Sequence, residues 1–500
     1  MLGSGAMSES SDETESDAEA LFEQGEALFK QERFAEALGC YERAIERNPL
    51  DARFFAGKGA ALGNLDRHAE ALPSSEQATR LDALCVRAWR NLSAHLRELK
   101  RYDEALMAVE RAIEIDPTDA RTHRLKGVAL EKLGRDEEAL VSFNRVLELD
   151  PESANGYGNK GYVLLKLNRA EEGLAACDQA ITYNPQLAIA HNNRAWALSL
   201  LQRYEEALAA SEHALEYDPK LVSAYQNSAL ALRSLKRHQE ALATCERALA
   251  LGLDEDVIYA QRILALTNVL RYREAIEASE QFVALRPRSV LAYTTKGWLL
   301  TAMRRPADAL QAYGRALELD ARHQVSYERI GQLLMQLGSP QEALGIYNLA
   351  LEIHPEAASL HANKAWVLAA LKRSPESLAS CEQALMIDPT LAYVYNIQGG
   401  ILNTLKRYDE ALLVLERAIE LDPRFEPAYR NKGLALCELK RYDEAVEAYA
   451  HALQIGTNKH LAYTGRGKTY LRQRRYLVGI VNLIYSPLWH YGAQFRRPTF

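Results

Sequence analysis

The sequence predicts an all-α protein, a solenoid of about thirteen helix-turn-helix repeats of 34 residues each. The octapeptide LKRYDEAL begins at residue 99 and again at residue 405, and LKRYDEAV begins at residue 439, which is 34 residues later. Counting in steps of 34 from residue 18 places Leu at position 11 of all thirteen repeats. Small residues and Pro recur at other fixed positions. A fixed period of this length is typical of stacked helical units that share a continuous core.

The first helix of each repeat is predicted from positions 4, 8 and 11, which fall on one helical face. Position 8 is Gly in eight repeats, as at Gly127, Gly161 and Gly433. Because Gly has no side chain, a second helix can approach this face closely. A large side chain there would overpack the contact at a cost of about 1–3 kcal/mol.

The second helix is predicted from positions 20, 24 and 27, which again share one face. Positions 20 and 27 are each Ala in eleven repeats, and position 32 is Pro in nine. Pro lacks the amide proton that a helix needs, so it ends the second helix and opens the next repeat. The octapeptide joins the two helices, and its acidic residues fall in the first turn of the second helix, where the helix dipole favours them.

The two ends of the chain differ from the repeats. Residues 1–17 are rich in Ser, Asp and Glu and are predicted to be a disordered acidic tail. Thirteen repeats occupy residues 18–459, and residues 460–500 are predicted to form a degenerate fourteenth repeat and a C-terminal cap. The apolar run at 476–489 suits a capping helix, which solenoids require. The alternative is a contact with a membrane surface, given Arg472, Arg474 and Arg475 nearby.

Composition and motifs argue against catalysis and against nucleic acid. The net charge is −7, whereas broad nucleic-acid binding needs a basic surface. The six Cys stand far apart without a CxxC pair, and no HExxH motif occurs. GRGKTY at 465–470 lacks the first Gly of a phosphate loop, because Ala462 stands there. We expect no enzymatic activity, catalytic residue, cofactor or metal. Without a signal peptide or a spanning segment, a cytoplasmic location is expected.

The residues of the period resemble those of the tetratricopeptide repeat: an aromatic at position 4, Gly or Ala at 8, Ala at 20 and 27, and Pro at 32. The resemblance covers residues 18–459. It implies a right-handed superhelix in which the first helix of every repeat lines a concave groove, with positions 2, 5, 6, 9, 12 and 13 facing the ligand. We call these the groove positions. It also implies protein or peptide ligands.

Asn recurs at one groove position. Six of the thirteen repeats have Asn at position 6: Asn91, Asn159, Asn193, Asn227, Asn363 and Asn431. A side-chain amide both donates and accepts hydrogen bonds, so a row of them can hold an extended peptide backbone without reading its sequence. This pattern resembles the asparagine ladder in the repeat domain of O-linked N-acetylglucosamine transferases. The alternative is that each Asn bonds to the neighbouring repeat.

Aromatic and basic residues occupy other groove positions. Position 9 carries Tyr162, Trp196, Trp298 and Trp366, which suit the anchoring of apolar side chains or packing against the next helix. The early repeats carry Arg at positions 2 and 5: Arg53, Arg87, Arg90, Arg121 and Arg124. This basic end would attract an acidic ligand segment, or it is a solvated face without a partner.

Together these features predict a non-enzymatic scaffold that binds extended peptide segments in its groove. The expected partners are proteins or peptides with acidic segments, and neither nucleic acid nor a membrane. The alternative is a substrate-recruitment module that works with a separate catalytic partner such as a glycosyltransferase. A structural scaffold without a groove ligand is a third interpretation.

Overall fold

The repeats fold as the predicted pairs of helices. The structure is a computed structural model that describes residues 5–456 and 459–484, and within these ranges the chain forms helices and turns without a strand. From repeat two onward the first helix begins at position 1, and in all thirteen repeats the second helix begins at position 17. The predicted all-α repeat solenoid is confirmed.

The first helices of successive repeats are α1 (Gly5–Lys30), α3 (Ala52–Asn64), α5 (Val86–Glu98), α7 (Ala120–Lys132), α9 (Ala154–Lys166), α11 (Ala188–Leu200), α13 (Val222–Ser234), α15 (Asp256–Asn268), α17 (Val290–Ala302), α19 (Gln324–Gln336), α21 (Ala358–Ala370), α23 (Ala392–Thr404), α25 (Glu426–Glu438) and α27 (His460–Arg472). The second helices are α2 (Phe34–Arg47), α4 (His68–Leu81), α6 (Tyr102–Ile115), α8 (Asp136–Leu149), α10 (Ala170–Tyr183), α12 (Tyr204–Tyr217), α14 (His238–Ala250), α16 (Tyr272–Leu285), α18 (Pro306–Leu319), α20 (Pro340–Ile353), α22 (Ser374–Ile387), α24 (Tyr408–Leu421) and α26 (Tyr442–Ile455).

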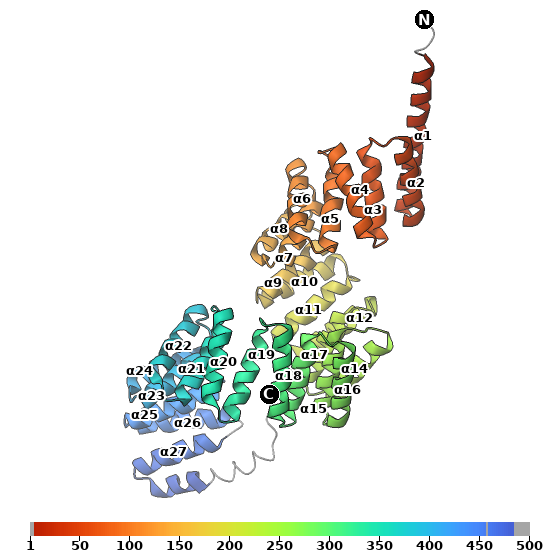
Figure 1. Cartoon of the computed structure of the whole chain (residues 1–500). Coiled ribbons are helices and arrows are strands. Elements are labelled where there is room, and N and C mark those ends of the chain that lie inside the picture. Colours follow the sequence, from red (N-terminus) through yellow and green to blue (C-terminus); the bar gives the residue numbers. More distant parts are fainter. Residues whose placement is uncertain (1–4, 457–458, 485–500) are drawn as a thin grey trace. The chain divides into compact units, whose positions relative to one another are not determined.

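The chain divides into two compact units, Met1–Val269 and Leu270–Phe500. The division falls inside repeat eight, between α15 and α16. Within each unit the helices stack side by side in chain order (Figure 1). Each unit therefore has a core made of contacts between neighbouring repeats, as expected for a solenoid.

The small residues at positions 8, 20 and 27 hold the two helices of a repeat close together. Ala37 and Ala44, at positions 20 and 27 of repeat one, have no exposed surface. A Cβ placed on Gly127, at position 8, would lie 2.6 Å from the Phe143 ring. No side chain fits in that space without moving the ring, so the predicted reason for the small residues is correct.

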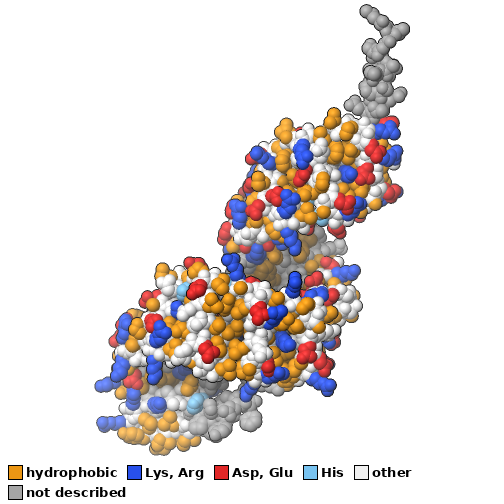
Figure 2. Space-filling model, viewed as in Figure 1, with side chains coloured by type: hydrophobic (Ala, Val, Ile, Leu, Met, Phe, Trp, Pro, Cys, Tyr) orange, Lys and Arg blue, Asp and Glu red, His pale blue; other side chains and the backbone are white. Residues whose placement is uncertain are grey.

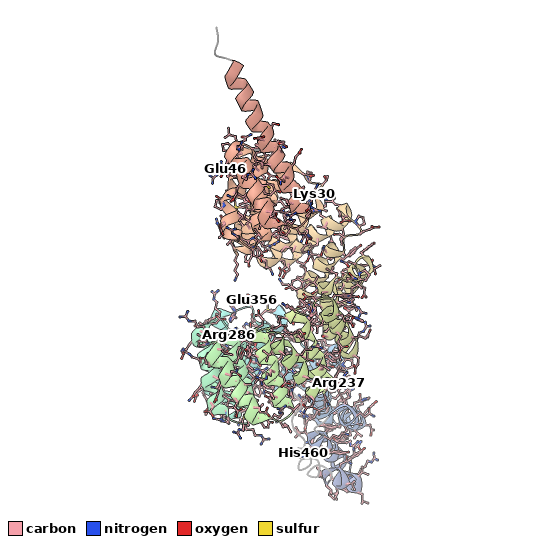
Figure 3. All side chains as sticks on the ribbon, turned by 90° about the vertical axis from the view of Figure 1, so that its right-hand side faces the viewer. Lys30, Glu46, Arg237, Arg286, Glu356 and His460 are labelled. Atoms are coloured by element: carbon pink, nitrogen blue, oxygen red, sulfur yellow. The ribbon has the colours of Figure 1, made fainter. Side chains whose placement is uncertain are left out.

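The octapeptide has a role in the structure that the sequence did not indicate. Its Arg, at position 16, precedes the second helix, and its Glu, at position 19, lies in the first turn. Arg237 projects from the start of α14 (Figure 3) and donates from Nε and Nη2 to the carboxylate of Glu240, at 2.7 and 2.6 Å. In most repeats the same fork joins the two positions, as at Arg33 and Glu36. The guanidinium lowers the pKa of each of these carboxyl groups through the hydrogen bond.

The turn between the helices needs a left-handed residue. Position 15 has a positive φ in every repeat, for example 61° at Lys100 and 59° at Lys372. Only Gly134 and Gly338 supply glycine at this position. After this residue, the amide of position 16 donates to the carbonyl of Leu 11, as Arg101 does to Leu96 at 2.8 Å. This is the hydrogen bond of a Schellman motif, and it closes the end of the first helix.

The predicted disordered tail differs from the structure. Helix α1 begins at Gly5, so residues 5–17 continue the first helix of repeat one, and residues 1–4 lie outside the described ranges. From Ala18 onward the helix is anchored on α2, and the Asp17 carboxylate accepts a hydrogen bond from Arg47 at 3.2 Å. Extending an anchored helix avoids the cost of nucleation, which explains how a polar segment adopts helical structure here.

The fourteenth repeat keeps the packing of the others through residue 484. Residues 476–484 are helical after α27. Gly479, at position 20, lies against α27 so that an added Cβ would be 3.1 Å from the Gly467 carbonyl oxygen. Arg466 donates to Asn482 at 2.8 Å across the same pair. The remainder of the predicted cap, from residue 485 to residue 500, lies outside the described residues.

Candidate functional site

The groove positions of the first unit line two cavities. One, of about 310 Å³, lies between α3 and α5 and brings together Arg87, Arg90 and Asn91. The other, of about 390 Å³, lies between α7 and α9 and is lined by Arg121 and Arg124 with Val146, Ser153 and Asn155 among others. Five predicted site residues thus line cavities on the surface that the first helices of the repeats form, which we call the first-helix face. The 34-residue period returns the same positions to this face in each repeat.

Four of the six predicted Asn donate to the preceding repeat. Asn91 donates to the Ala56 carbonyl at 2.9 Å, and Asn193 donates to the Gly158 carbonyl at 3.3 Å. Asn227 donates to the Asn192 side-chain oxygen at 3.0 Å, and Asn431 donates to the Asn396 side-chain oxygen at 2.9 Å. The sequence left open that each Asn bonds to the neighbouring repeat, and the structure has this bond at these four positions. The four amides differ in what they retain: Asn227 Nδ2 contacts both the backbone and the side-chain oxygen of Asn192, and Asn193 Oδ1 already accepts from Asn192 at 3.4 Å.

Asn159 and Asn363 differ from the other four. Both are half-buried, and neither side chain forms a hydrogen bond with any residue that the structure describes. Their donors and acceptors are therefore all available to water or to a ligand.

The four predicted aromatic residues lie in two different environments. Tyr162 and Trp196 contact each other, with ring centroids 5.8 Å apart and planes tilted by 57°, and Tyr162 also packs on the core of repeats three to five. Trp298 is half-buried on α17. Trp366 on α21 is 42% exposed, so a large apolar ring meets solvent there. The first pair supports the stacking of repeats, whereas Trp366 has a free face.

Most of the predicted basic residues are neutralised within the chain. Arg53 pairs with Asp51 at 2.7 Å and with Glu19 at 2.6 Å. Arg87 pairs with Glu26 at 2.8 Å, and Arg90 pairs with Asp119 at 2.9 Å. These guanidiniums would have to exchange one carboxylate for another to bind an acidic ligand.

Arg121 and Arg124 are the exceptions. No carboxylate among the described residues pairs with either guanidinium. Arg124 is half-buried, and burial, followed by the charges of Arg97 and Arg121, lowers its pKa below the usual value for arginine. A bound anion would stabilise the charged form of an arginine whose pKa is lowered in this way.

Sequence reasoning missed His95, which lies beneath the first cavity. It is 3% exposed, and its Nδ1 is 3.3 Å from Nδ1 of His68. Position 10 is Ala, Val, Leu or Ile in every other repeat, so a single His in this apolar position was the available signal. Burial, followed by the charge of nearby His68, lowers the pKa of His95 to about 4.

The described part of the chain gives little support to metal binding or to a cysteine nucleophile. No group of three or more His, Cys, Asp or Glu is placed to hold a metal ion there. Burial raises the pKa values of the Cys177, Cys245 and Cys381 thiols to about 12, which makes them poor nucleophiles. Basic and acidic side chains are mixed over the visible face of each unit (Figure 2).

Across the described residues, no helix is both long enough and apolar enough to cross a membrane.

The stacked helix pairs and the lined first-helix face define a helical-repeat protein. Models of the tetratricopeptide repeat match residues 18–51, 84–152, 159–219, 201–255, 294–358, 328–392 and 404–460. The chain belongs to the tetratricopeptide repeat family, and this family and fold support a protein-interaction scaffold.

Several solved structures are similar to the chain at low identity. A structure of the APC/C hetero-tetramer Cut9–Hcn1 is 14% identical over 94% of each chain, with a TM-score of 0.48. Yeast Tom70 is 15% identical over 91% of this chain and 96% of that one, with a TM-score of 0.42. YrrB, a TPR protein with an unusual peptide-binding site, is 22% identical over 37% of this chain and 95% of that one, with a TM-score of 0.31. Comparison with curated proteins found no match.

Proposed function

We propose that the chain is a scaffold that binds an extended peptide along the first-helix face of its first unit, with an acidic residue of the peptide against Arg121 and Arg124. The observation that carries this proposal is the contrast in charge pairing along the face. Arg53, Arg87 and Arg90 have carboxylate partners, whereas Arg121 and Arg124 have none in the described residues and border a cavity of about 390 Å³.

The Asn at position 6 would hold the peptide backbone in this arrangement. Asn159 follows one repeat after Arg124 and has all its hydrogen-bonding capacity free among the described residues. Asn193 is 2% exposed, donates to Gly158 and accepts from Asn192, so it supports the stacking of repeats, whereas the half-buried Asn227 keeps its side-chain oxygen free among the described residues. In this proposal the amides that face the peptide are Asn159 and, through its side-chain oxygen, Asn227, beside an Asn193 that is fixed to the neighbouring repeat.

The proposal is tested by the binding of an acidic peptide. The probe is a fluorescein-labelled peptide that alternates Asp with apolar residues, measured by fluorescence anisotropy at low and high salt. Arg121→Gln and Arg124→Gln are each expected to weaken binding about 10-fold, because a charge-assisted hydrogen bond contributes roughly 1.5–3 kcal/mol. The loss should be smaller at high salt, where exposed charges are screened.

Arg53→Gln is the matched control, since its guanidinium already pairs with Asp51 and Glu19. Equal weakening by Arg53→Gln and Arg124→Gln would show that net charge, and not the unpaired arginines, attracts the peptide. Binding that is unaffected by all three variants would contradict the proposal.

The two kinds of Asn separate binding from stability. Asn193→Ala removes a bond to the buried Gly158 carbonyl, so we expect a loss of unfolding free energy of about 1–3 kcal/mol. Asn159→Ala breaks no hydrogen bond in the described structure, so stability should change by less than ~0.5 kcal/mol while peptide affinity falls. Urea unfolding and anisotropy with the same probe measure both effects. If Asn159→Ala leaves peptide affinity unchanged, this amide does not hold the ligand.

A further inference from the structure

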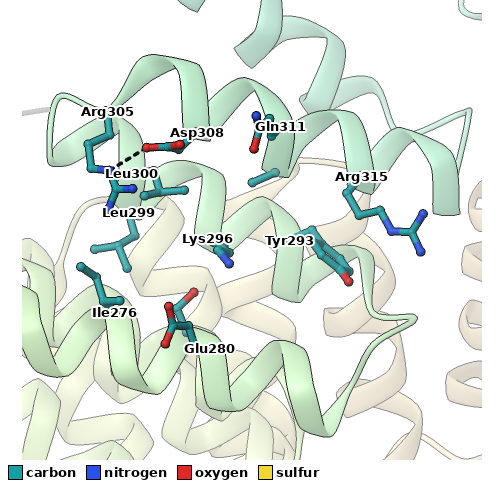
Figure 4. A pocket seen from close by; sticks show the side chains of 12 residues that line it. Ile276, Glu280, Tyr293, Lys296, Leu299, Leu300, Arg305, Asp308, Gln311 and Arg315 are labelled. Atoms are coloured by element: carbon teal, nitrogen blue, oxygen red, sulfur yellow. Dashed lines mark hydrogen bonds and ion pairs between the residues drawn. The ribbon is translucent and has the colours of Figure 1, made fainter.

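The second unit has a cavity that the groove positions do not form. It has a volume of about 290 Å³ and lies between α16, α17 and α18 (Figure 4). Its apolar wall comes from Ile276, Leu299, Leu300 and Ala312. From α17 it uses positions 4, 7, 10 and 11, which point away from the groove, so a ligand here would not compete with a peptide on the first-helix face.

A buried hydroxyl in this cavity lacks a partner. Ser279 lines the cavity and is 1% exposed, and its Oγ forms no hydrogen bond with the described residues. At the same position of repeat six, Ser211 donates to the Ala207 carbonyl at 3.0 Å. Burying a hydroxyl without a partner is unfavourable, so the Ser279 hydroxyl is a group that a ligand in the cavity would satisfy.

Two oppositely charged side chains, an ammonium and a carboxylate, line the same cavity without forming an ion pair. Lys296 on α17 points toward Glu280 on α16 (Figure 4), yet no ion pair within 4.0 Å connects them in the described structure. In other repeats the equivalent Lys and Glu side chains form an ion pair. The equivalent pairs are Lys58 with Glu42 at 3.0 Å, Lys126 with Glu110 at 2.9 Å, and Lys432 with Glu416 at 2.9 Å. Repeats eight and nine therefore hold a carboxylate and an ammonium apart, with a cavity next to them.

The remaining charges of the rim are already paired. Arg305 donates to Asp308 at 2.7 Å, and Arg315 donates to Glu318. Lys296 and Glu280 are consequently the two charged groups of this cavity that are available to a ligand.

We propose that this cavity binds a small zwitterion with an apolar side chain, namely a free amino acid such as leucine or phenylalanine. The ligand carboxylate would pair with Lys296 and its ammonium with Glu280, while its side chain would contact Leu299, Leu300 and Ile276. The Ser279 hydroxyl would gain a hydrogen-bond partner. Pockets for small ligands are typically apolar with a few polar groups that fix orientation, as here. This site is separate from the proposed peptide groove and does not depend on it.

The test is isothermal titration calorimetry of the full chain with L-leucine and L-phenylalanine. N-acetyl-leucine lacks the ammonium and imitates a peptide C-terminus, and leucinamide lacks the carboxylate and imitates an N-terminus. Both are expected to bind at least about 10-fold more weakly than the free amino acid, because each loses a charge-assisted bond. Lys296→Met and Glu280→Gln should cause losses of the same size.

Lys58→Met is the matched control because its pair with Glu42 is closed, and it should leave amino-acid binding unchanged. Ser279→Val retains a small side chain and removes the hydroxyl, and it should weaken binding without unfolding the chain, which circular dichroism checks. Absence of heat with both amino acids would overturn the proposal. So would equal binding of the blocked analogues, or equal binding by Lys296→Met and the unmodified chain.

Discussion

Replacing Tyr347 with alanine will cost about 3–5 kcal/mol of unfolding free energy, the largest effect expected for a single substitution in the second unit. The Tyr347 side chain has no exposed surface and lies in the core shared by repeats nine to eleven. It fills the space beside Gly331, where an added Cβ would lie 2.3 Å from its ring. Its hydroxyl also lies 3.3 Å from the Glu328 carbonyl oxygen, to which it donates. Alanine would leave a cavity and remove this hydrogen bond.

Hydrogen exchange is the measurement of choice, because a repeat array need not unfold in one step. Protection should fall in α19, α20 and α21 before it falls in distant helices of the same unit. Leu349→Ala is the control, since Leu349 lies on the same helix and is 46% exposed. Comparable destabilisation by the two variants would contradict the assigned packing.

The stability of the first unit will fall as the pH drops from about 6.5 to about 4 because of His95. The folded pKa of this side chain is about 4, below its ordinary value of 6.5. Between these values the unfolded state binds more protons, so the unfolding free energy decreases as the pH falls. The full contribution is present above pH 6.5 and is lost once the pH passes below the folded pKa. A shift of this size corresponds to about 3 kcal/mol.

His95→Leu should remove most of this pH dependence, because Leu occupies position 10 in repeats nine and ten. A smaller part comes from His238, whose pKa burial also lowers. Urea unfolding at pH 7 and pH 5 measures the difference. This range also lies above the pH at which the exposed Arg–Glu pairs begin to protonate, since the pKa of those Glu is lowered from 4.5. The exposed His213 provides the control as His213→Gln. A variant His95→Leu that keeps the full loss between pH 7 and pH 5 would refute the assignment.

The position of His95 connects this prediction to the proposed groove. The imidazole lies at a cavity that Arg87, Arg90 and Asn91 also line. Protonation would place a further cation among guanidiniums whose carboxylate partners are Glu26 and Asp119. Acid pH therefore weakens the packing under the groove at the place where repeats two and three meet.

The repeat pattern predicted the fold almost completely, since one period fixed both helices, their order and their packing faces. The groove positions came from the resemblance to the tetratricopeptide repeat, and they stay a prediction. The repeat pattern did not predict that Arg87 pairs with Glu26, because the two residues lie in repeats one and three and meet only when those repeats stack. For the same reason it could not separate Asn193, which bonds to Gly158, from Asn159, which has no such partner among the described residues.

The sequence by itself determined the period, the pairing of helices and the close-packed positions, because these depend on local propensity and on spacing along a single chain. The tertiary structure decided which polar groups remain free. Whether Arg124 lacks a carboxylate, or whether Lys296 and Glu280 stay apart while Lys58 and Glu42 join, depends on distances between side chains of different helices. Such distances follow from the packing of every neighbouring residue, which a repeat pattern describes only on average.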